Sequence, residues 1–221
     1  MRFSRFGNGF ILSCQPLRGG ALDRPDIVAA YAQMGDSLGV GGLRIESLAD
    51  TQAVRQVTKL PLIGLVKRQP QGFEVYITPE LHDVSALAAA GADIIAFDAT
   101  ERSRPVSIRE LVAAIHEQGC AAMADVSTLS EGLASSAAGA DFVATTLSGY
   151  TPYSPQLEGP DLQLVRDLVE AGITVVAEGR IRTPGEMRQA LERGALAVTV
   201  GSAIAPPELI TQTFLEVLKP A

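Results

Sequence analysis

Cysteine and histidine are scarce in this sequence of 221 residues. The two cysteines, Cys14 and Cys120, and the two histidines, His82 and His116, stand in no spacing typical of a zinc site or a disulfide framework. No histidine is placed by the sequence to activate Cys14, which we expect to be a small buried apolar residue. We therefore expect neither a structural metal nor a thiol-based activity.

Positive charge is also limited. Eighteen Lys and Arg residues stand against 25 Asp and Glu residues, which gives a net charge of -7, and there is no basic block. This composition argues against binding to nucleic acid or to an anionic membrane. No segment approaches the roughly eighteen apolar residues of a membrane helix, and the apolar run at 10–12 is too short for a signal peptide. The sequence is that expected of a soluble cytoplasmic protein.

Short apolar runs alternate with longer helix-like segments along the chain, which is typical of a parallel sheet. The glycines of two Ala-Gly-Ala-Asp junctions, Gly91 and Gly139, and Gly194 in a third copy are expected to end helices in the left-handed conformation. The expected strands are 9–15, 42–46, 62–67, 94–98, 121–125, 142–146, 174–178 and 197–201, and the clearest helices are 26–38, 78–90, 108–118, 162–171 and 184–193.

Eight such units in this length predict an α/β fold, a single (β/α)8 TIM barrel that forms one domain over residues 1–221. A doubly wound open sheet is the alternative, but the chain has neither of the glycine-rich phosphate loops that would favour it. Residues 147–160, rich in glycine and proline, are expected to form a loop after the sixth strand and to serve as a lid.

Nearly every expected strand ends in a polar residue, at the edge where barrels of this class build their active sites. Strand ends meet solvent, so polarity alone has a structural explanation, but the mixture of charges does not. The residues at these ends are Gln15, Arg44 with Glu46, Lys67, Asp98, Asp125, Thr145 with Thr146, Glu178, and Gly201 with Ser202.

Lys67 and Glu178 end the third and seventh strands, and therefore face each other across the barrel mouth. Two opposed proton-transfer groups suit epimerisation next to a carbonyl, because a proton leaves one face of the carbon and returns to the other. Alternatives are a surface lysine that extends into solvent, a Schiff-base lysine, and a glutamate that merely pairs with Arg180 or Arg182.

The loops after the seventh and eighth strands commonly hold phosphate in this fold. Here they carry Gly179 with Arg180, and Gly201 with Ser202, where backbone N–H groups can approach an anion. A helix that begins near Pro206 would add its N-terminal dipole if its axis points at the ligand. Arg44, Asp98 and Asp125 are candidates for sugar-hydroxyl contacts, carbonyl polarisation or a structural ion pair.

Taken together, these motifs make the chain similar to the bacterial N-acetylmannosamine-6-phosphate 2-epimerases, also called N-acylglucosamine-6-phosphate 2-epimerases. The resemblance covers nearly the whole chain. It includes Ser13-Cys14-Gln15-Pro16, Arg44-Ile45-Glu46, the Pro61 to Arg68 segment, Ile77-Thr78-Pro79, Asp98-Ala99-Thr100, Met123-Ala124-Asp125, the Thr145 to Thr151 segment, Glu178-Gly179-Arg180 and the Val198 to Ile204 segment.

The resemblance implies a (β/α)8 isomerase, often a homodimer, that interconverts N-acetylmannosamine 6-phosphate and N-acetylglucosamine 6-phosphate in amino-sugar and sialic acid catabolism without a cofactor. It implies Lys67 and Glu178 as the proton-transfer pair, and Gln15, Arg44 and Asp125 as substrate contacts. Gly179, Arg180, Gly201 and Ser202 are carried over as the phosphate cradle.

The chain departs from the family pattern after Gly-Ser-Ala-Ile, where Ala205-Pro206 replaces the usual Thr-Arg. A cationic contact is thereby lost, which Arg180 or Arg182 could supply instead. Two further functions stay open beside the epimerase: a Schiff-base aldolase that uses Lys67, and a phosphosugar-binding protein without turnover.

Overall fold

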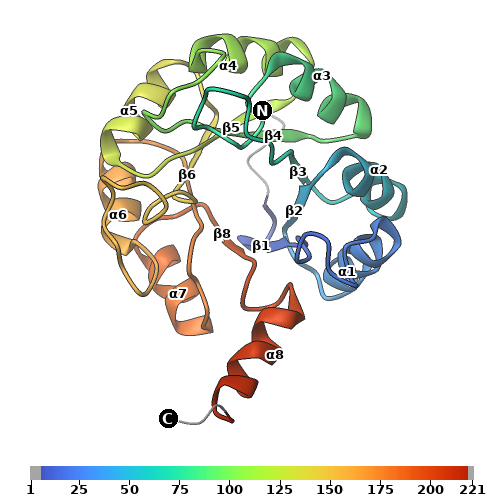
Figure 1. Cartoon of the computed structure of the whole chain (residues 1–221). Helices are drawn as coiled ribbons and strands as arrows, with labels where there is room; N and C mark the ends of the chain where they lie inside the picture. The colour runs from blue at the N-terminus through green and yellow to red at the C-terminus, as the bar shows by residue number, and fades with distance from the viewer. Residues whose placement is uncertain (1–5, 219–221) are drawn as a thin grey trace.

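A computed structural model describes residues 6–218 of the chain. Eight parallel strands close into a barrel, and a helix follows each strand (Figure 1). The strands are β1 (Phe10–Ser13), β2 (Gly42–Glu46), β3 (Leu62–Leu65), β4 (Ile94–Asp98), β5 (Ala121–Asp125), β6 (Phe142–Ala144), β7 (Val175–Ala177) and β8 (Ala197–Val200). The helices are α1 (Pro25–Ser37), α2 (Leu48–Val57), α3 (Leu81–Ala90), α4 (Ile108–Glu117), α5 (Leu129–Ala137), α6 (Leu162–Glu170), α7 (Pro184–Glu192) and α8 (Pro207–Glu216).

The predicted (β/α)8 barrel is confirmed, and every expected strand contains the observed one. The sheet closes where β1 pairs with β8 in the register Phe10 to Val198. Because both faces of such a barrel are buried, several strands, such as β3 and β6, are continuously apolar. The open-sheet alternative is therefore excluded by the closed pairing.

Alternation along each strand divides the core into two layers. In β3, Ile63 and Leu65 pack inside the barrel, whereas Leu62 packs outward beneath the helices. The interior layer contains small residues such as Ala96 and Ala144, which let eight strands close around a filled centre. The same alternation continues past the strand ends and decides which polar side chains face inward.

Local sequence explains most helix boundaries. Ser107, Thr128 and Thr183 each form a capping box with a glutamate three residues later. The junction glycines Gly91, Gly139 and Gly194 have φ values of 101°, 100° and 93°, as predicted for left-handed helix ends.

One boundary prediction was wrong. The helix expected from residue 78 begins at Leu81, because Glu80 and Asp83 form the capping box there. Thr78 instead pairs with the segment after β3, and its N–H donates to the Val66 carbonyl oxygen at 2.8 Å.

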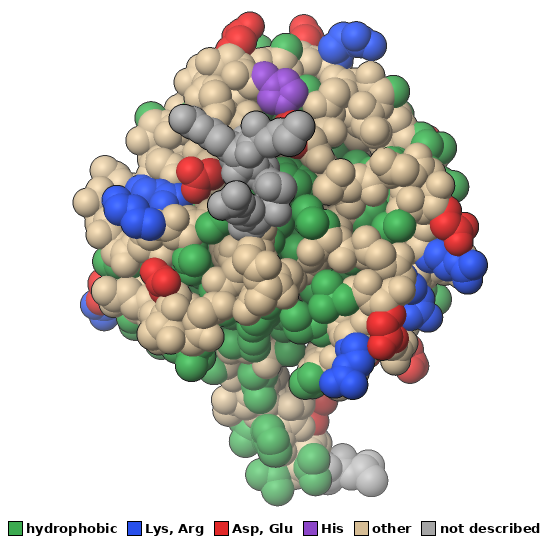
Figure 2. Space-filling model, turned by 180° about the vertical axis from the view of Figure 1, so that it is seen from behind, with side chains coloured by type: hydrophobic (Ala, Val, Ile, Leu, Met, Phe, Trp, Pro, Cys, Tyr) green, Lys and Arg blue, Asp and Glu red, His purple; other side chains and the backbone are tan. Residues whose placement is uncertain are grey.

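The last helix differs from the other seven in its packing. In the described part of the chain, α8 has no buried residue, and it projects away from the ring of helices (Figure 1). Seen from behind, apolar side chains cover this projection at the bottom of the view (Figure 2). They include Phe214 at 75 % exposed and Leu218 at 78 % exposed. Among the described residues, no helix is long and apolar enough to cross a membrane.

Replacing Phe97 by Ala will test the outer core. Phe97 is fully buried between the sheet and its helices, so Phe97→Ala is expected to lower the free energy of unfolding by about 3–5 kcal/mol. Chemical denaturation measures this change. The control is Leu38→Ala, at a side chain that is 75 % exposed, where we expect a change of at most about 0.5 kcal/mol. Equal changes in the two variants would contradict the described packing.

Candidate functional site

A cavity of about 340 Å³ opens at the carboxyl ends of the strands. It collects inward-facing side chains from the ends of several strands, together with the loops that follow β7 and β8. The site residues predicted from the sequence line it, except Asp125, which pairs with Arg44, and Asp98, which pairs with Arg102 outside the lining. The lining residues are Ser13, Gln15, Pro16, Arg44, Lys67, Tyr76, Ile77, Thr146, Leu147, Tyr150, Glu178, Gly179, Arg180, Ile181, Thr199, Gly201, Ser202, Ala205 and Pro206.

Lys67 reaches the cavity from the segment that follows β3. An antiparallel bridge between Lys67 and Ile77 fixes this segment against the next stretch of chain. The ammonium donates to Gln15 Oε1 at 2.6 Å and lies 3.0 Å from Glu46 Oε2. The side chain is 37 % exposed. Lys67 is thus held by two acceptors at the mouth and is not an unrestrained surface lysine.

Arg44 and Asp125 form a bidentate ion pair inside the barrel. Arg44 Nη2 lies 2.7 Å from Asp125 Oδ2, and Nη1 lies 3.2 Å from Oδ1. Both side chains are almost completely buried, and Thr146 Oγ1 also donates to Asp125 Oδ1 at 2.7 Å. Burial alone would lower the pKa of Arg44, but the carboxylates of Asp125 and Glu178 raise it overall. The guanidinium is therefore a permanent positive charge at the cavity floor.

Glu178 points into the same cavity from the end of β7. Its Oε2 lies 3.3 Å from Arg44 Nη1. Burial raises the pKa of Glu178 to about 7, Asp125 adds to this shift, and the positive charges of Arg44 and Lys67 oppose it. In the described chain, Glu178 pairs with Arg44 and not with Arg180 or Arg182. A carboxyl group with this pKa is present in both protonation states near neutral pH, as proton exchange requires.

The two predicted phosphate loops lie side by side at the cavity. Gly179 and Arg180 have φ values of 107° and 55°, so the chain turns sharply after Glu178. Within residues 6–218, the backbone N–H groups of Gly179, Arg180, Gly201 and Ser202 donate no hydrogen bond. Four unused donors around one opening form an arrangement that can hold an anion.

Arg180 also fastens the loop that covers one side of the cavity. Its Nη1 donates to the Ser148 carbonyl oxygen at 2.7 Å and its Nε to that of Gly159 at 2.8 Å. The guanidinium lies over the Tyr150 ring, 5.6 Å from its centroid. Of the two arginines proposed to replace the missing cation, Arg180 lines the cavity and the exposed Arg182 does not.

Several lining residues were not selected from the sequence. Tyr76, Ile77 and Tyr150 come from loops, and no strand-end pattern points to them. Burial raises the pKa of Tyr76 to about 12, so its hydroxyl stays a neutral donor. Glu46 was visible at a strand end, but its contact with Lys67 could not be read from the sequence.

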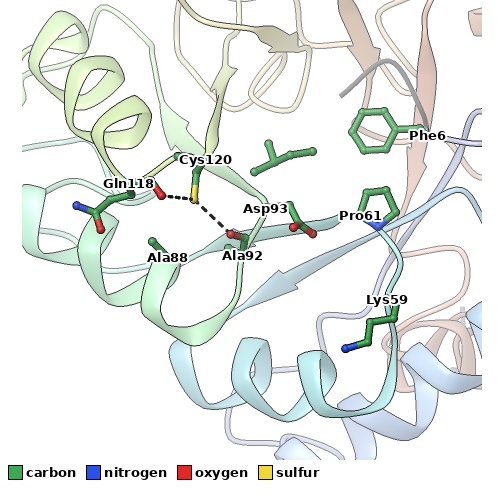
Figure 3. Close-up of a pocket in the computed structure, with 10 residues that line it drawn as sticks. Phe6, Lys59, Pro61, Ala88, Ala92, Asp93, Gln118 and Cys120 are labelled. Atoms are coloured by element: carbon green, nitrogen blue, oxygen red, sulfur yellow. Dashed lines mark hydrogen bonds between the residues drawn. The ribbon is translucent and has the colours of Figure 1, made fainter. Parts of the chain in front are cut away.

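Two other features of the molecule lie outside this cavity. A second hollow of about 310 Å³ at the opposite end of the barrel is lined by Phe6, Lys59 and Cys120 among others (Figure 3). It contains none of the predicted site residues. The thiol of Cys14 is buried, which raises its pKa to about 12, in agreement with the expected inert packing role.

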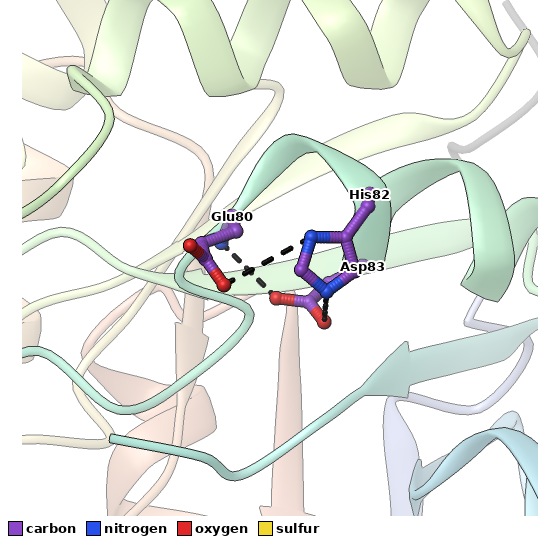
Figure 4. Close-up of side chains that lie close together, drawn as sticks. All are labelled: Glu80, His82 and Asp83. Atoms are coloured by element: carbon purple, nitrogen blue, oxygen red, sulfur yellow. Dashed lines mark hydrogen bonds and ion pairs between the residues drawn. The ribbon is translucent and has the colours of Figure 1, made fainter. Parts of the chain in front are cut away.

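Glu80, His82 and Asp83 meet at the start of α3 (Figure 4). Their side chains could offer ligand atoms to a cation. However, Arg68 already lies 2.6 Å from Glu80 Oε2 and 2.8 Å from Asp83 Oδ2. The cluster is therefore an ion-pair network around Arg68.

The closed barrel and its charged cavity at the carboxyl ends of the strands place the chain among the (β/α)8-barrel enzymes. Residues 28–220 match the family model described as "Putative N-acetylmannosamine-6-phosphate epimerase". The chain therefore belongs to the N-acetylmannosamine-6-phosphate epimerase family, which confirms the resemblance seen in its motifs.

Individual relatives agree with this assignment. Proteins named "Putative N-acetylmannosamine-6-phosphate 2-epimerase" from Yersinia pestis (strain Pestoides F) and Escherichia coli O127:H6 are each 50% identical, over 96% of this chain and 91% and 93% of theirs. The solved N-acetylmannosamine-6-phosphate 2-epimerase from Clostridium perfringens is 41% identical with a TM-score of 0.92, over 96% of this chain and 94% of that one. These relatives do not favour the aldolase or binding-protein alternatives.

Removing the charge of Asp125 will test the cavity floor. In Asp125→Asn, Arg44 stays charged and buried but loses its bidentate carboxylate partner and keeps only the longer contact with Glu178, so we expect the free energy of unfolding to fall by about 3 kcal/mol or more. Chemical denaturation at neutral pH measures the loss. The control Asp26→Asn removes a carboxylate from an exposed pair with Arg24, where the change should stay below about 1 kcal/mol. Similar losses in both variants would contradict the importance of the buried pair.

Proposed function

We propose that the chain interconverts N-acetylmannosamine 6-phosphate and N-acetylglucosamine 6-phosphate by removing and replacing the proton on C2. One observation carries this proposal. Lys67 and Glu178 follow β3 and β7, four strands apart, and line one cavity together with Arg44. Family membership supports the choice of sugar phosphate.

The reaction starts from the open-chain aldehyde, in which the carbonyl makes the neighbouring C2 proton removable. One of the two groups takes this proton, and an enediolate-like intermediate forms with negative charge on the carbonyl oxygen. A proton then returns to the opposite face of C2 from the other group. The pKa of Glu178, raised to about 7 by burial, supports its part in either half of the exchange.

Arg44 is placed to stabilise the charge that develops on the carbonyl oxygen. Its Nε is buried and has no hydrogen-bond partner among the described residues, while its other nitrogens contact Asp125 and Glu178. A fixed, desolvated donor of this kind needs no reorganisation when charge appears, and it therefore favours the transition state.

The phosphate is assigned to the loops after β7 and β8. The unused N–H groups of Gly179, Arg180, Gly201 and Ser202 support this assignment, and Arg180 supplies the positive charge that Ala205-Pro206 lacks. We assign Gln15, which accepts from Lys67 Nζ, to the reacting end of the sugar.

Proton NMR in heavy water will test the reaction. Wild-type protein should exchange the C2 proton of N-acetylmannosamine 6-phosphate for deuterium and produce the other epimer. Lys67→Ala and Glu178→Gln are each expected to lower turnover by about two to four orders of magnitude, because each removes a proton-transfer group. Lys59→Ala, at an exposed lysine outside the cavity, should keep normal turnover.

Near-normal turnover in both Lys67→Ala and Glu178→Gln would refute the residue assignment. A substrate adduct on Lys67 that borohydride can trap would favour Schiff-base chemistry instead. Binding measured by calorimetry without exchange at C2 would favour a binding protein.

We also propose that the chain forms a homodimer through α8. Each copy has one helix with no buried residue, and that helix stands apart from α7 and α1 (Figure 1). Ile210 and Phe214 lie one helical turn apart on α8 and form an apolar stripe, and the exposed Leu218 follows just after the end of the helix. We propose a second copy of the chain as the partner of this surface. In a symmetric dimer, each α8 would pack on the barrel of the other copy, so both exposed helices would be buried.

Light scattering will test the dimer. The monomer has a mass of 23.2 kDa, and light scattering on the wild type should give a molar mass of twice this value. Phe214→Asp places a charge in the apolar stripe and should give monomers at micromolar concentration. Gln212→Asp, on the opposite side of the same helix, should leave the dimer intact. A monomeric wild type, or a dimeric Phe214→Asp, would overturn the proposal.

A further inference from the structure

Glu46 contacts Lys67 more directly than any other carboxylate in the described chain. It ends β2 on the inward-facing side, two residues after Arg44. Its Oε2 lies 3.0 Å from Lys67 Nζ, and its side chain is only 15% exposed. At this separation the Glu46 carboxylate is a direct ion-pair partner of the Lys67 ammonium.

Arg18 closes the arrangement from the outside. Its Nη2 donates to Glu46 Oε1, and the same nitrogen donates to the main-chain oxygen of Lys67 at 3.0 Å. The Arg18 side chain is 70% exposed, so solvent weakens its field but does not remove it. The three residues therefore form a line of alternating charge, with the two oxygens of Glu46 divided between two cations.

The other charged groups near Lys67 have separate partners. Glu178 pairs with Arg44 across the cavity floor, and Arg180 is bound to the carbonyl oxygens of the loop at 147–160. Gln15 holds the lysine ammonium without adding charge. Glu46 is thus the charge that acts on Lys67 at contact distance, and Arg18 is the charge that acts on Glu46.

We propose that Glu46 is a positioning residue that holds Lys67 at the cavity mouth and sets how readily it releases its proton, and that Arg18 moderates this effect by sharing the Glu46 carboxylate. The inference rests on the proposed function, in which Lys67 must both accept and return a proton. An unshared carboxylate would hold that proton too firmly for return to a carbon atom. Without the carboxylate, Gln15 alone would orient the amine.

The scarcity of lysine allows a direct test that needs no substrate. Amine acylation requires the neutral amine, so its rate at a given pH reports how firmly Lys67 holds its proton. Brief treatment of the folded protein with acetic anhydride, followed by peptide mass spectrometry, gives the rate at Lys67 relative to exposed Lys59 in the same molecule. The ratio is measured from pH 6 to pH 10.

Glu46→Gln should raise the relative rate at Lys67 by roughly threefold to tenfold, because an amide replaces the negative charge at contact distance. Arg18→Gln should lower it by about twofold, because Glu46 then acts on Lys67 alone. The double variant should resemble Glu46→Gln, since most of the Arg18 effect passes through Glu46. Arg24→Gln removes an exposed arginine paired with Asp26 and should leave the ratio unchanged.

The opposite signs separate this role from a merely structural one. Unchanged reactivity in Glu46→Gln, or a change in the same direction in Glu46→Gln and Arg18→Gln, would overturn the proposal. If Glu46→Gln fails to fold, two other variants test the proposal. Arg18→Gln should slow the acylation of Lys67, and Glu46→Asp, whose shorter side chain holds the carboxylate farther away, should speed it. Heavy-water NMR on the wild type tests the epimerase reaction, whereas acylation tests the role of Glu46. Failure of one proposal can therefore be told apart from failure of the other.

Discussion

Closure of the sheet between β1 and β8 constrains every inward-facing side chain in the molecule. Once the strands form a ring, alternate residues of each strand enter one enclosed interior. The lower part of this interior is filled by residues such as Ile63 and Met123. Farther toward the carboxyl ends of the strands, the inward-facing positions are occupied by Arg44, Asp125 and Lys67. The packing of the core and the composition of the cavity therefore follow from the same alternation of side chains.

This constraint brings like charges together, and the structure balances them by pairing. Three carboxylates, Glu46, Asp125 and Glu178, form ion pairs with the two cavity cations Arg44 and Lys67. Asp125 takes both terminal nitrogens of Arg44, whereas Glu178 receives one longer contact at 3.3 Å. The incompletely paired carboxylate is the one whose pKa is raised to about 7. Burial is the main cause of this shift, and the single longer contact with Arg44 opposes it only in part.

Much of the fold and site could be predicted from the sequence, because the period-two alternation of strands is visible there. In a closed barrel this alternation determines which side chains face the interior. Lys67, Arg44 and Glu178 follow from their places at strand ends. Tyr76 and Arg18 do not, because a loop brings Tyr76 to the cavity and another brings Arg18 to Glu46, and no periodicity fixes a loop. The position of α8 was equally hidden, since its sequence indicates a helix but not that the helix lies away from the barrel.

Arg180 joins two parts of the molecule that the chain keeps separate. It follows the phosphate loop after β7, and its guanidinium holds Ser148 and Gly159 at the two ends of the neighbouring loop. Gly149 lies so close to that guanidinium that a Cβ there would come within 2.3 Å of Nη1. An anion that binds more tightly when these contacts are made must, by thermodynamic reciprocity, strengthen them by the same factor. Binding of an anion by the loops after β7 and β8 and ordering of the loop at 147–160 are therefore thermodynamically coupled.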